Sequence, residues 1–319
     1  MRVLITGVSG FVGGYLARRL AEGGHELLGL GVQPAPAELP LATYRLADLT
    51  RLEQVEPALG ELAPAAIVNL AGQASAARSF EDPGETFRVN TTGALVLLEA
   101  VRRAAPRARV LQVGSGESYG PQPPGTRVAE SAPFRPVSPY ALSKAAADTA
   151  CAAYAEANDL DLVRTRSFAH TGPGQDSRFV LPSFARQIAR LERGAGEAVL
   201  RVGNLEVTRD LSDVRDVVAA YVALLERGVR GAAYNVCRGE GVRLADVAAR
   251  LTSLARVAVR IEVDPARVRP VDVPYLVGDP TAIARVTGWR AAIPIEQTLR
   301  DTLEEWRRRE ASSPPEAAG

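Results

Sequence analysis

Histidine and cysteine are scarce in this 319-residue sequence, which has two of each. His25 and His170 cannot build a three-histidine zinc site, and Cys151 and Cys237 form neither a disulfide framework nor a metal cluster. A Ser-His-Asp hydrolase would have to recruit one of these two histidines. These absences argue against a zinc enzyme and a serine hydrolase. We expect no metal site and two reduced structural thiols.

Lysine is almost missing. Of the 38 basic residues, 37 are Arg, and Lys144 is the one lysine. Arg serves wherever a plain cation is enough. It cannot replace a compact ammonium whose pKa can shift, because its guanidinium is larger and stays charged. Lys144 is therefore a candidate for chemistry, although a solvated helix lysine is the alternative.

The sequence also lacks an excess of either charge and any long apolar run. The net charge is +1, which indicates neither a nucleic-acid partner nor an anionic membrane partner. No apolar run approaches the ~18 residues of a membrane span. The N-terminal residues reach a glycine-rich turn at once, without the apolar core of a signal peptide. We expect a cytoplasmic location.

Short apolar runs alternate with helical patterns through the first half of the chain. The pattern predicts a doubly wound parallel Rossmann sheet, covered on both faces, followed by a smaller mixed α/β substrate domain. We expect the first domain to span 1–168, with segments near 212–237 packing back on it, the second to span mainly 169–310, and 311–319 to be a flexible tail. Strands are expected at 2–6, 27–31, 43–47, 66–70, 109–113, 161–166, 233–236 and 259–263, and helices at 11–22, 52–62, 86–103, 140–158, 181–193, 214–226, 244–254 and 295–309.

A glycine-rich turn follows the first predicted strand. Gly7, Gly10 and Gly13, with Phe11 and Val12 between the last two, open a predicted helix. Such a turn lets backbone N–H groups approach a pyrophosphate at the helix N-terminus. A purely structural tight turn is the alternative. The strand–turn–helix context favours dinucleotide binding.

The choice between NAD and NADP depends on the end of the second strand. NAD-binding folds usually carry an acid there for the ribose hydroxyls, but at the end of this strand and beyond it no acid occurs until Glu38. We expect NADP or NAD as cofactor, with NADPH slightly favoured. Asp48, followed by Leu49, could accept a hydrogen bond from the adenine amino group; capping the next helix is the alternative.

Tyr140 and Lys144 lie four residues apart in a predicted helix, so their side chains start from one face ~5–6 Å apart. At that distance we expect the ammonium to lower the phenol pKa by roughly two units, since a cation ~5 Å away contributes about 3 kcal/mol. The pair would then be a tuned proton donor for a carbonyl. Ser115, at the end of the fifth strand, could orient the same oxygen. An ordinary turn serine is the alternative.

These residues resemble the extended short-chain dehydrogenase/reductase family. The resemblance rests on the turn at 7–13, Asn69-Leu70-Ala71-Gly72, Asn90, Ser115 and the Tyr140–Lys144 pair, and it covers the whole chain except the tail. It implies a nicotinamide cofactor held by these segments, a nucleotide-sugar substrate and a Ser-Tyr-Lys triad. It also implies a homodimer formed through a four-helix bundle, here from helices around 91–103 and 140–154.

The C-terminal half resembles the GDP-mannose branch of this family, through 166–175, 179–184, 202–210 and 272–280. With 113–117, these stretches are most similar to GDP-4-keto-6-deoxy-D-mannose reductases, which make GDP-D-rhamnose. The resemblance implies a GDP-sugar substrate, with Arg209 and Arg269 on the diphosphate and Asn204 nearby. Family members usually carry an Asn that contacts the substrate where this chain has Ala169. The resemblance therefore implies that this contact to the sugar or diphosphate is lost or is made by His170 instead.

Alternatives to the reductase remain open. GDP-mannose 4,6-dehydratases share several of these stretches and place a Glu two residues after the Ser or Thr, where Glu117 stands. Reductases also carry an acid there, while Gly116 and the short chain fit the reductase better. Another nucleotide-sugar epimerase or reductase is a further alternative. A non-catalytic cofactor-binding protein is a minor one, because Ser115, Tyr140 and Lys144 are all present.

Overall fold

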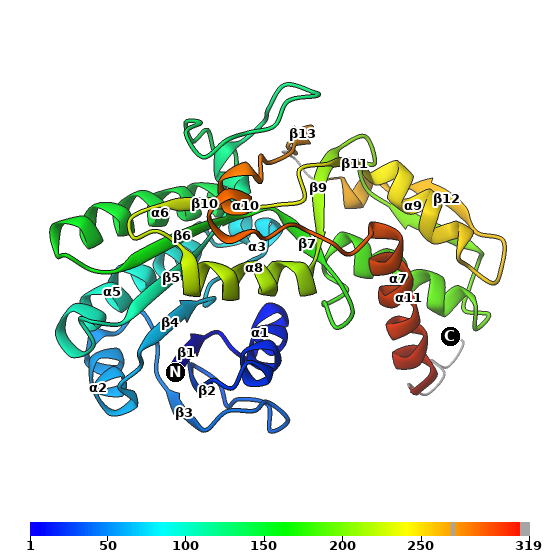
Figure 1. Ribbon diagram of the computed structural model, residues 1–319. Coiled ribbons are helices and arrows are strands. Elements are labelled where there is room, and N and C mark those ends of the chain that lie inside the picture. Colours follow the sequence, from blue (N-terminus) through cyan, green and yellow to red (C-terminus); the bar gives the residue numbers. More distant parts are fainter. Residues whose placement is uncertain (269–271, 313–319) are drawn as a thin grey trace.

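The computed structural model describes residues 1–268 and 272–312. Its centre is a seven-stranded sheet in the order β10-β6-β5-β4-β1-β2-β3, in which all neighbouring strands are parallel (Figure 1). The expected doubly wound parallel sheet is therefore confirmed. The strands are β1 (Arg2–Thr6), β2 (Glu26–Gly31), β3 (Thr43–Leu46), β4 (Ala66–Asn69), β5 (Arg109–Ser115), β6 (Leu162–Ser167) and β10 (Ala233–Val236).

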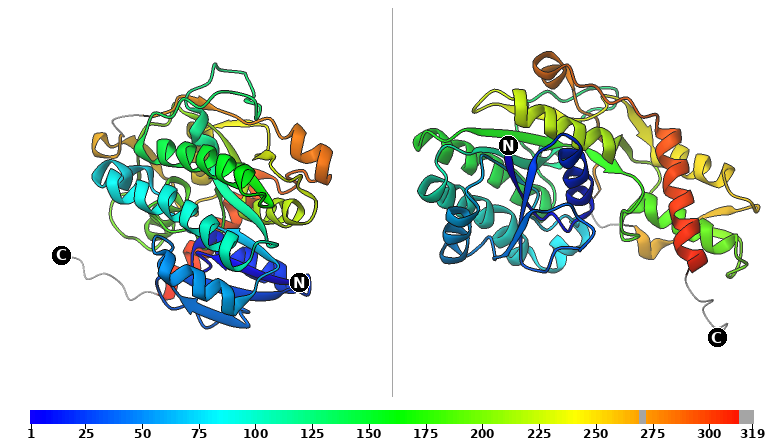
Figure 2. Two further views of the ribbon diagram at one scale, coloured as in Figure 1. Left: turned by 90° about the vertical axis from the view of Figure 1, so that its left-hand side faces the viewer. Right: turned by 60° about the horizontal axis from the view of Figure 1, so that its bottom comes forward.

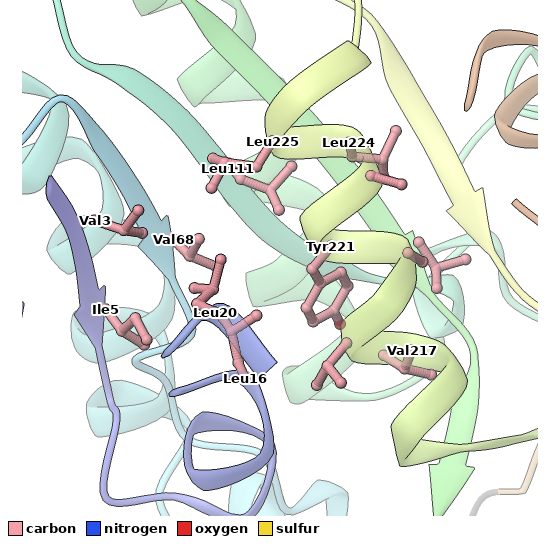
Figure 3. Close-up of a cluster of buried hydrophobic side chains, with 14 of the residues drawn as sticks. Val3, Ile5, Leu16, Leu20, Val68, Leu111, Val217, Tyr221, Leu224 and Leu225 are labelled. Atoms are coloured by element: carbon pink, nitrogen blue, oxygen red, sulfur yellow. The ribbon is translucent and has the colours of Figure 1, made fainter. Parts of the chain in front are cut away.

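Helices cover both faces of this sheet because the strand side chains alternate between two apolar clusters. Val3 and Ile5 of β1 point to the face covered by α1 (Phe11–Glu22) and α8 (Val214–Arg227), as Figure 3 shows. Leu4 points to the opposite face, which is covered by α2 (Leu52–Leu62), α5 (Gly93–Ala104) and α6 (Pro139–Ala157). Strand β10 thus belongs to the first sheet and helix α8 covers one of its faces, although both lie late in the chain.

A second lobe lies beside the sheet, and Figure 2 shows it from two further sides with its last helix in red. Its centre is β9, which pairs in parallel with β7 and β13 and antiparallel with β11, while β8 and β12 form a separate parallel pair. Helices α7, α9 and α11 pack on it around an apolar cluster. These elements are β7 (Ala169–Thr171), α7 (Val180–Leu191), β8 (Val199–Val202), β9 (Thr208–Asp213), β11 (Gly241–Arg243), α9 (Leu244–Ser253), β12 (Arg260–Val263), β13 (Tyr275–Leu276) and α11 (Ile295–Ser312).

Several elements differ from expectation. The helix expected at 86–103 is composite: α4 (Pro83–Phe87) runs through a π-helical turn, Arg88–Thr92, into α5. Helices α3 (Ala76–Glu81) and α10 (Thr281–Thr287) and strands β7, β8, β9, β11 and β13 were not expected. They are short, and a polar strand such as Thr208–Asp213 shows little apolar alternation. Of the expected tail, 311–312 complete α11, and 313–319 lie outside the described residues.

Candidate active site

The turn between β1 and α1 approaches the β4 loop closely. Gly7 has φ +66°, and a Cβ there would lie 2.9 Å from the backbone nitrogen of Ala71. A Cβ on Gly13 would lie 2.5 Å from the carbonyl oxygen of Val8. Gly10 is the N-cap of α1 and offers no side-chain cap, and the first turn has no acid. The free N–H groups of this helix start and the absence of side chains make a cradle that fits a pyrophosphate.

Phe11 and Val12 contribute packing beside this cradle. Both are partly buried against the α1–α8 core, and the Phe11 ring stacks edge-on against Tyr15 at 5.7 Å. The Tyr15 hydroxyl donates to the carbonyl of Pro173 at 2.8 Å. The first turns of α1 are thereby tied to the loop that leads into the second lobe.

Asp48 forms a local turn after β3. One carboxylate oxygen accepts from the backbone N–H of Thr50 at 2.9 Å and from its hydroxyl at 2.8 Å. Burial raises the pKa of Asp48, but the Thr50 bonds and the guanidinium of Arg88 outweigh it, so the pKa is lowered. Asp48 is not the cap of α2, because the N-cap position belongs to Arg51. Leu49 packs against the core under α2 and α5.

Asn90 sits in the π-helical turn and fastens the loop after β4. Its Oδ1 accepts from the backbone N–H of Gln73 at 2.8 Å, and its Nδ2 donates to Ser143 Oγ of α6 at 3.0 Å. Gly72 lies in this loop after Leu70 and Ala71. A Cβ on Gly72 would lie 2.8 Å from Asn90 Oδ1 and 3.3 Å from Lys144 Nζ. Gly72, Asn90 and Lys144 are thus brought together at the carboxyl edge of the sheet.

Ser115, Glu117 and Tyr140 meet at the end of β5. Ser115 ends the strand and caps a 3₁₀ turn, Gly116–Tyr119, by accepting from the N–H of Glu117 at 3.2 Å. Tyr140 lies beside both, since the Ser115 hydroxyl and the Glu117 carboxylate each shift the pKa of its phenol. Burial, followed by the carboxylate of Glu117, raises the pKa of Tyr140 above its ordinary value. The phenol therefore keeps its proton firmly at neutral pH.

The expectation that Lys144 lowers the Tyr140 pKa is wrong for this structure. Helical spacing brings the Cβ atoms together but does not set where two long side chains end. Tyr140 extends toward Ser115, whereas Lys144 Nζ donates to the carbonyl of Val113 at 3.3 Å. Lys144 is 8% exposed, and burial lowers its own pKa to about 8.

His170 lies in β7, where the chain leaves the first lobe. Its Nδ1–H donates to the carbonyl of Phe168 at 2.9 Å, since a carbonyl can only accept. Burial lowers the pKa of His170, and the bond to Phe168 opposes the shift. The ring is therefore neutral at pH 7, with Nε2 as an acceptor. The Phe168 ring packs on Gly116 of the Ser115 turn, at a distance that excludes a Cβ.

Arg209 and Asn204 converge on Asp272, which sequence reasoning did not single out. Arg209 Nη2 donates to one carboxylate oxygen at 2.7 Å, and Asn204 Nδ2 donates to the other at 3.4 Å. Arg209 also donates to the carbonyls of Thr208 and Val273. Its guanidinium is thus held in place on the second lobe. Arg269 lies outside the described residues.

Further polar residues at the strand ends support the site. Thr6 Oγ1 donates to Asn69 Oδ1, and Asn69 Nδ2 donates to Gln112 Oε1 at 2.8 Å. The N–H of Ala71 donates to Thr6 Oγ1 at 3.2 Å. This buried row crosses β1, β4 and β5. Buried polar residues near the ends of parallel strands were the sequence signal that could have identified it.

The described residues contain neither a metal-binding cluster nor a membrane-spanning helix. Among residues 1–268 and 272–312, no group of three or more His, Cys, Asp or Glu side chains is arranged to hold a metal. No helix in that part of the chain is long and apolar enough to cross a membrane.

Comparison with known proteins identifies the family to which the chain is similar. Residues 4–302 match the family model described as GDP-mannose 4,6 dehydratase. GDP-6-deoxy-D-mannose reductase of Pseudomonas aeruginosa is 36% identical, covering 97% of this chain and 98% of that protein. GDP-mannose 4,6 dehydratase 2 of Arabidopsis thaliana is 32% identical, covering 95% of this chain and 86% of that protein.

One solved structure is also similar over nearly the full length of both chains. RMD from Pseudomonas aeruginosa, complexed with NADPH, superposes with a TM-score of 0.82 at 33% identity, covering 97% of this chain and 99% of that chain. The family model and these relatives align almost from end to end, as the motifs of the dinucleotide turn and the Tyr140–Lys144 pair predicted. The chain belongs to the GDP-mannose 4,6-dehydratase family of extended short-chain dehydrogenases/reductases.

Proposed function

We propose that this chain reduces the C4 keto group of GDP-4-keto-6-deoxy-D-mannose to give GDP-D-rhamnose, with Tyr140 as proton donor. Its family makes it an NAD(P)-dependent oxidoreductase of nucleotide sugars. The observation that carries the proposal is that Tyr140 lies beside Ser115, with buried Lys144 one helical turn away, at the carboxyl edge of the sheet that carries the dinucleotide cradle. The end-to-end likeness to a GDP-6-deoxy-D-mannose reductase supports the substrate.

The cradle residues fit a nicotinamide dinucleotide. Gly7, Gly10 and Gly13 would leave room for the pyrophosphate beside the start of α1, with Phe11 and Val12 packed next to it. The carboxylate of Asp48, which is paired with Arg88, and the backbone of Leu49 would border the adenine. Residues 70–72 with Asn90 and Lys144 would border the nicotinamide half. The bound cofactor supplies the hydride that goes to C4. We propose NADPH, which the similar solved structure contains, with NAD as the alternative.

The protein residues supply one proton to the carbonyl oxygen of the substrate and orient that oxygen. Tyr140 holds its proton at neutral pH because its pKa is raised, so it can donate to the carbonyl oxygen as the negative charge develops there. Ser115 donates a second hydrogen bond to that oxygen. After the transfer, the Ser115 hydroxyl can donate to the Tyr140 phenolate. Lys144 is charged at pH 7 because its pKa is about 8, and its ammonium lies beside Val113 and Gly72, where it would hold the nicotinamide half of the cofactor.

We propose that 1–168, with α8 and β10, form the cofactor domain and that 169–310 mainly bind the substrate. Arg209 suits the diphosphate, because its planar fork matches phosphate oxygens. Asp272 holds that fork in place, and Asn204 in turn donates to Asp272. His170 offers an Nε2 acceptor to a sugar hydroxyl near the Ser115 turn.

The dehydratase is the second candidate, because the carboxylate of Glu117 lies close enough to Tyr140 to raise its pKa. A carboxylate beside the phenol could remove the C5 proton of a 4-keto sugar. The reductase stays preferred on the similarity to the Pseudomonas aeruginosa protein over nearly the full length of both chains.

We further propose a homodimer formed through α5 and α6. Leu142, Ala146, Thr149, Ala150 and Ala153 lie on one face of α6 and are exposed or half-exposed, although most are apolar. Light scattering should give about twice the 33.9 kDa of the chain, and Ala150→Arg should halve the mass. A cytoplasmic location fits two buried free thiols and a reduced nicotinamide cofactor.

The function is tested by NADPH oxidation. Purified protein with GDP-4-keto-6-deoxy-D-mannose should consume NADPH and yield a GDP-6-deoxyhexose whose C4 configuration NMR assigns as that of rhamnose. No oxidation with NADPH or NADH would refute the reductase. Formation of the 4-keto sugar from GDP-mannose with oxidised cofactor would then establish the dehydratase.

A further inference from the structure

A buried ionic cluster on the α6 side of the sheet is not used by the chemistry described above. Arg166 of β6 is 8% exposed. It donates two hydrogen bonds to Asp148 of α6, from Nε to Oδ2 at 3.1 Å and from Nη2 to Oδ1 at 3.2 Å. Arg164 donates to the same carboxylate. Asp148 stands one helical turn after Lys144, so the cluster adjoins the candidate active site.

The remaining donor of Arg166 faces away from α6. Its Nη1 donates to the hydroxyl of Tyr119 at 2.8 Å and to the backbone carbonyl of Glu130 at 2.7 Å. The guanidinium also lies over the ring of Phe134 at 4.5 Å. Arg166 therefore joins β6 and α6 to the excursion 120–138, which leaves the sheet after the Ser115 turn.

Tyr119 is the last residue of that turn and is fully buried. Its hydroxyl accepts from Arg166 and donates to Asn235 Oδ1 of β10 at 2.8 Å. Asn235 Nδ2 in turn donates to the carbonyl of Val128 at 2.8 Å. The phenol is thus the common point between the Ser115 turn, the sheet and the excursion.

The excursion continues this connection into the second lobe. Val128 exchanges backbone hydrogen bonds with 277–279, its N–H to Val277 and its carbonyl to the N–H of Asp279, both at 2.9 Å. The preceding residues, Tyr275–Leu276, form β13 and pair with Thr208 and Arg209 of β9. A continuous set of hydrogen bonds therefore runs from the turn that carries Ser115 to the strand that carries Arg209.

Stability alone is a weak reason for such a cluster. Burying charge costs solvation that the ion pair barely recovers, and well-packed apolar residues often serve as well. Arg164 Nε is moreover buried without a partner among the described residues. What an apolar replacement could not do is fix direction, because the Arg166 fork and the Tyr119 hydroxyl each set angles as well as distances.

We propose that Arg166 and Tyr119 are positioning residues that hold the Ser115 turn in register with the segment 275–279 of the second lobe. The inference rests on the proposed function, since it assigns these residues to the alignment of a substrate bound by the second lobe with the proton donor on the first. Misplacement near 1 Å lowers rates by about 100-fold in well-aligned sites. The two side chains touch neither substrate nor cofactor.

The test is Tyr119→Phe, with Tyr234→Phe as the matched control. Both remove a buried phenolic hydroxyl, but that of Tyr234 only accepts from the N–H of Val229 at 3.1 Å. Tyr119→Phe keeps the ring contacts with Phe134 and Phe168. We expect kcat/KM for the 4-keto sugar to fall about 10- to 100-fold while the NADPH Kd stays unchanged. Tyr234→Phe should keep kcat/KM at a comparable loss of stability, so a general structural effect is excluded.

Arg166→Lys supplies a second measurement. Lysine can still pair with Asp148 but cannot span Asp148, Tyr119 and Glu130 at once. If Arg166 acts through Tyr119, the double variant should be no slower than the slower single variant. Wild-type kcat/KM in Tyr119→Phe, or fully multiplicative losses in the double variant, would overturn the proposal.

Amide hydrogen exchange separates this proposal from the proposed function. If wild type and Tyr234→Phe do not reduce the substrate, the proposed function has failed, and exchange then decides the positioning role. Faster exchange in Tyr119→Phe at both 116–119 and 275–279 supports the connection. A change confined to 116–119, or none, overturns it.

Discussion

Replacing Lys144 by Met should stabilise the protein while it removes activity. Burial lowers the pKa of Lys144 from 10.5 to about 8. At 1.36 kcal/mol per pKa unit, keeping the buried ammonium charged costs about 3 kcal/mol of folding free energy at pH 7. Methionine has no charge to bury, but its introduction loses the bond to the Val113 carbonyl, worth about 1.5 kcal/mol. We expect a net gain near about 1.5 kcal/mol in the free energy of unfolding.

The pH dependence identifies the cause. The folded state binds fewer protons than the unfolded state between pH 8 and pH 10.5, so wild type becomes relatively more stable as pH rises through that window. The advantage of Lys144→Met should be full below pH 8, vanish near about pH 9.5 and reverse by pH 10.5, where the cost of the charge has gone and the lost bond to Val113 remains. Urea unfolding of both proteins without cofactor, at pH 7 and pH 9.5, measures the gap.

Lys144→Arg is the matched control, because guanidinium stays charged throughout this range. It should be no more stable than wild type at pH 7 and should fall further behind as pH rises above 8. A Lys144→Met protein that is less stable than wild type at pH 7, or a gap that ignores pH, would refute the reasoning. Both variants should lack reductase turnover, and a fully active Lys144→Arg would remove the assigned role of the ammonium.

The remaining predictions concern the proton donor, the cradle and the second lobe. Tyr140→Phe should abolish NADPH oxidation and leave the NADPH Kd unchanged; near-normal kcat would exclude the phenol as donor. In wild type, kcat should fall as pH rises through about 8, because Lys144 loses its proton there, and a flat profile to pH 10 would contradict this. Gly13→Ala places a Cβ 2.5 Å from the Val8 carbonyl oxygen and should abolish NADPH binding. Gly60→Ala in α2, where a Cβ meets nothing within 4 Å, should keep NADPH binding and stabilise the protein by about 0.5–1 kcal/mol. Equal NADPH affinities of the two variants would refute the steric argument. Arg209→Lys should raise KM for the GDP-sugar about tenfold or more by losing the planar fork, with the cofactor Kd constant, and an unchanged KM would remove Arg209 from the substrate site.

Local pattern was enough for much of the first lobe. β1, α1 and α2 have the bounds that apolar periodicity predicts, since each element combines a regular apolar face with a Gly or polar boundary. The carboxyl edge of the parallel sheet likewise follows from β–α alternation, and this placed Ser115 at that edge before any contact was known.

The second lobe was harder because its strands are defined by partners. β9 holds Arg209 and Asp210 in a short polar stretch, and it becomes a strand by pairing with segments about 40 and 70 residues away. Asp272 was missed for the same reason. The π-helical turn that aims Asn90 at the β4 loop also has no local signal, because its backbone is held by contacts with Gln73 and Ser143.

The sequence by itself determined the fold class, the family and most residue types at the site, because periodicity, glycine spacing and the solitary lysine are local or compositional facts. Tertiary structure alone decided the directions and energies of those side chains. Tyr140 turns to Ser115 and Lys144 to Val113, so their pKa values follow burial more than their mutual attraction. Desolvation and hydrogen-bond direction depend on all the elements that pack around a group, and helical spacing does not set them.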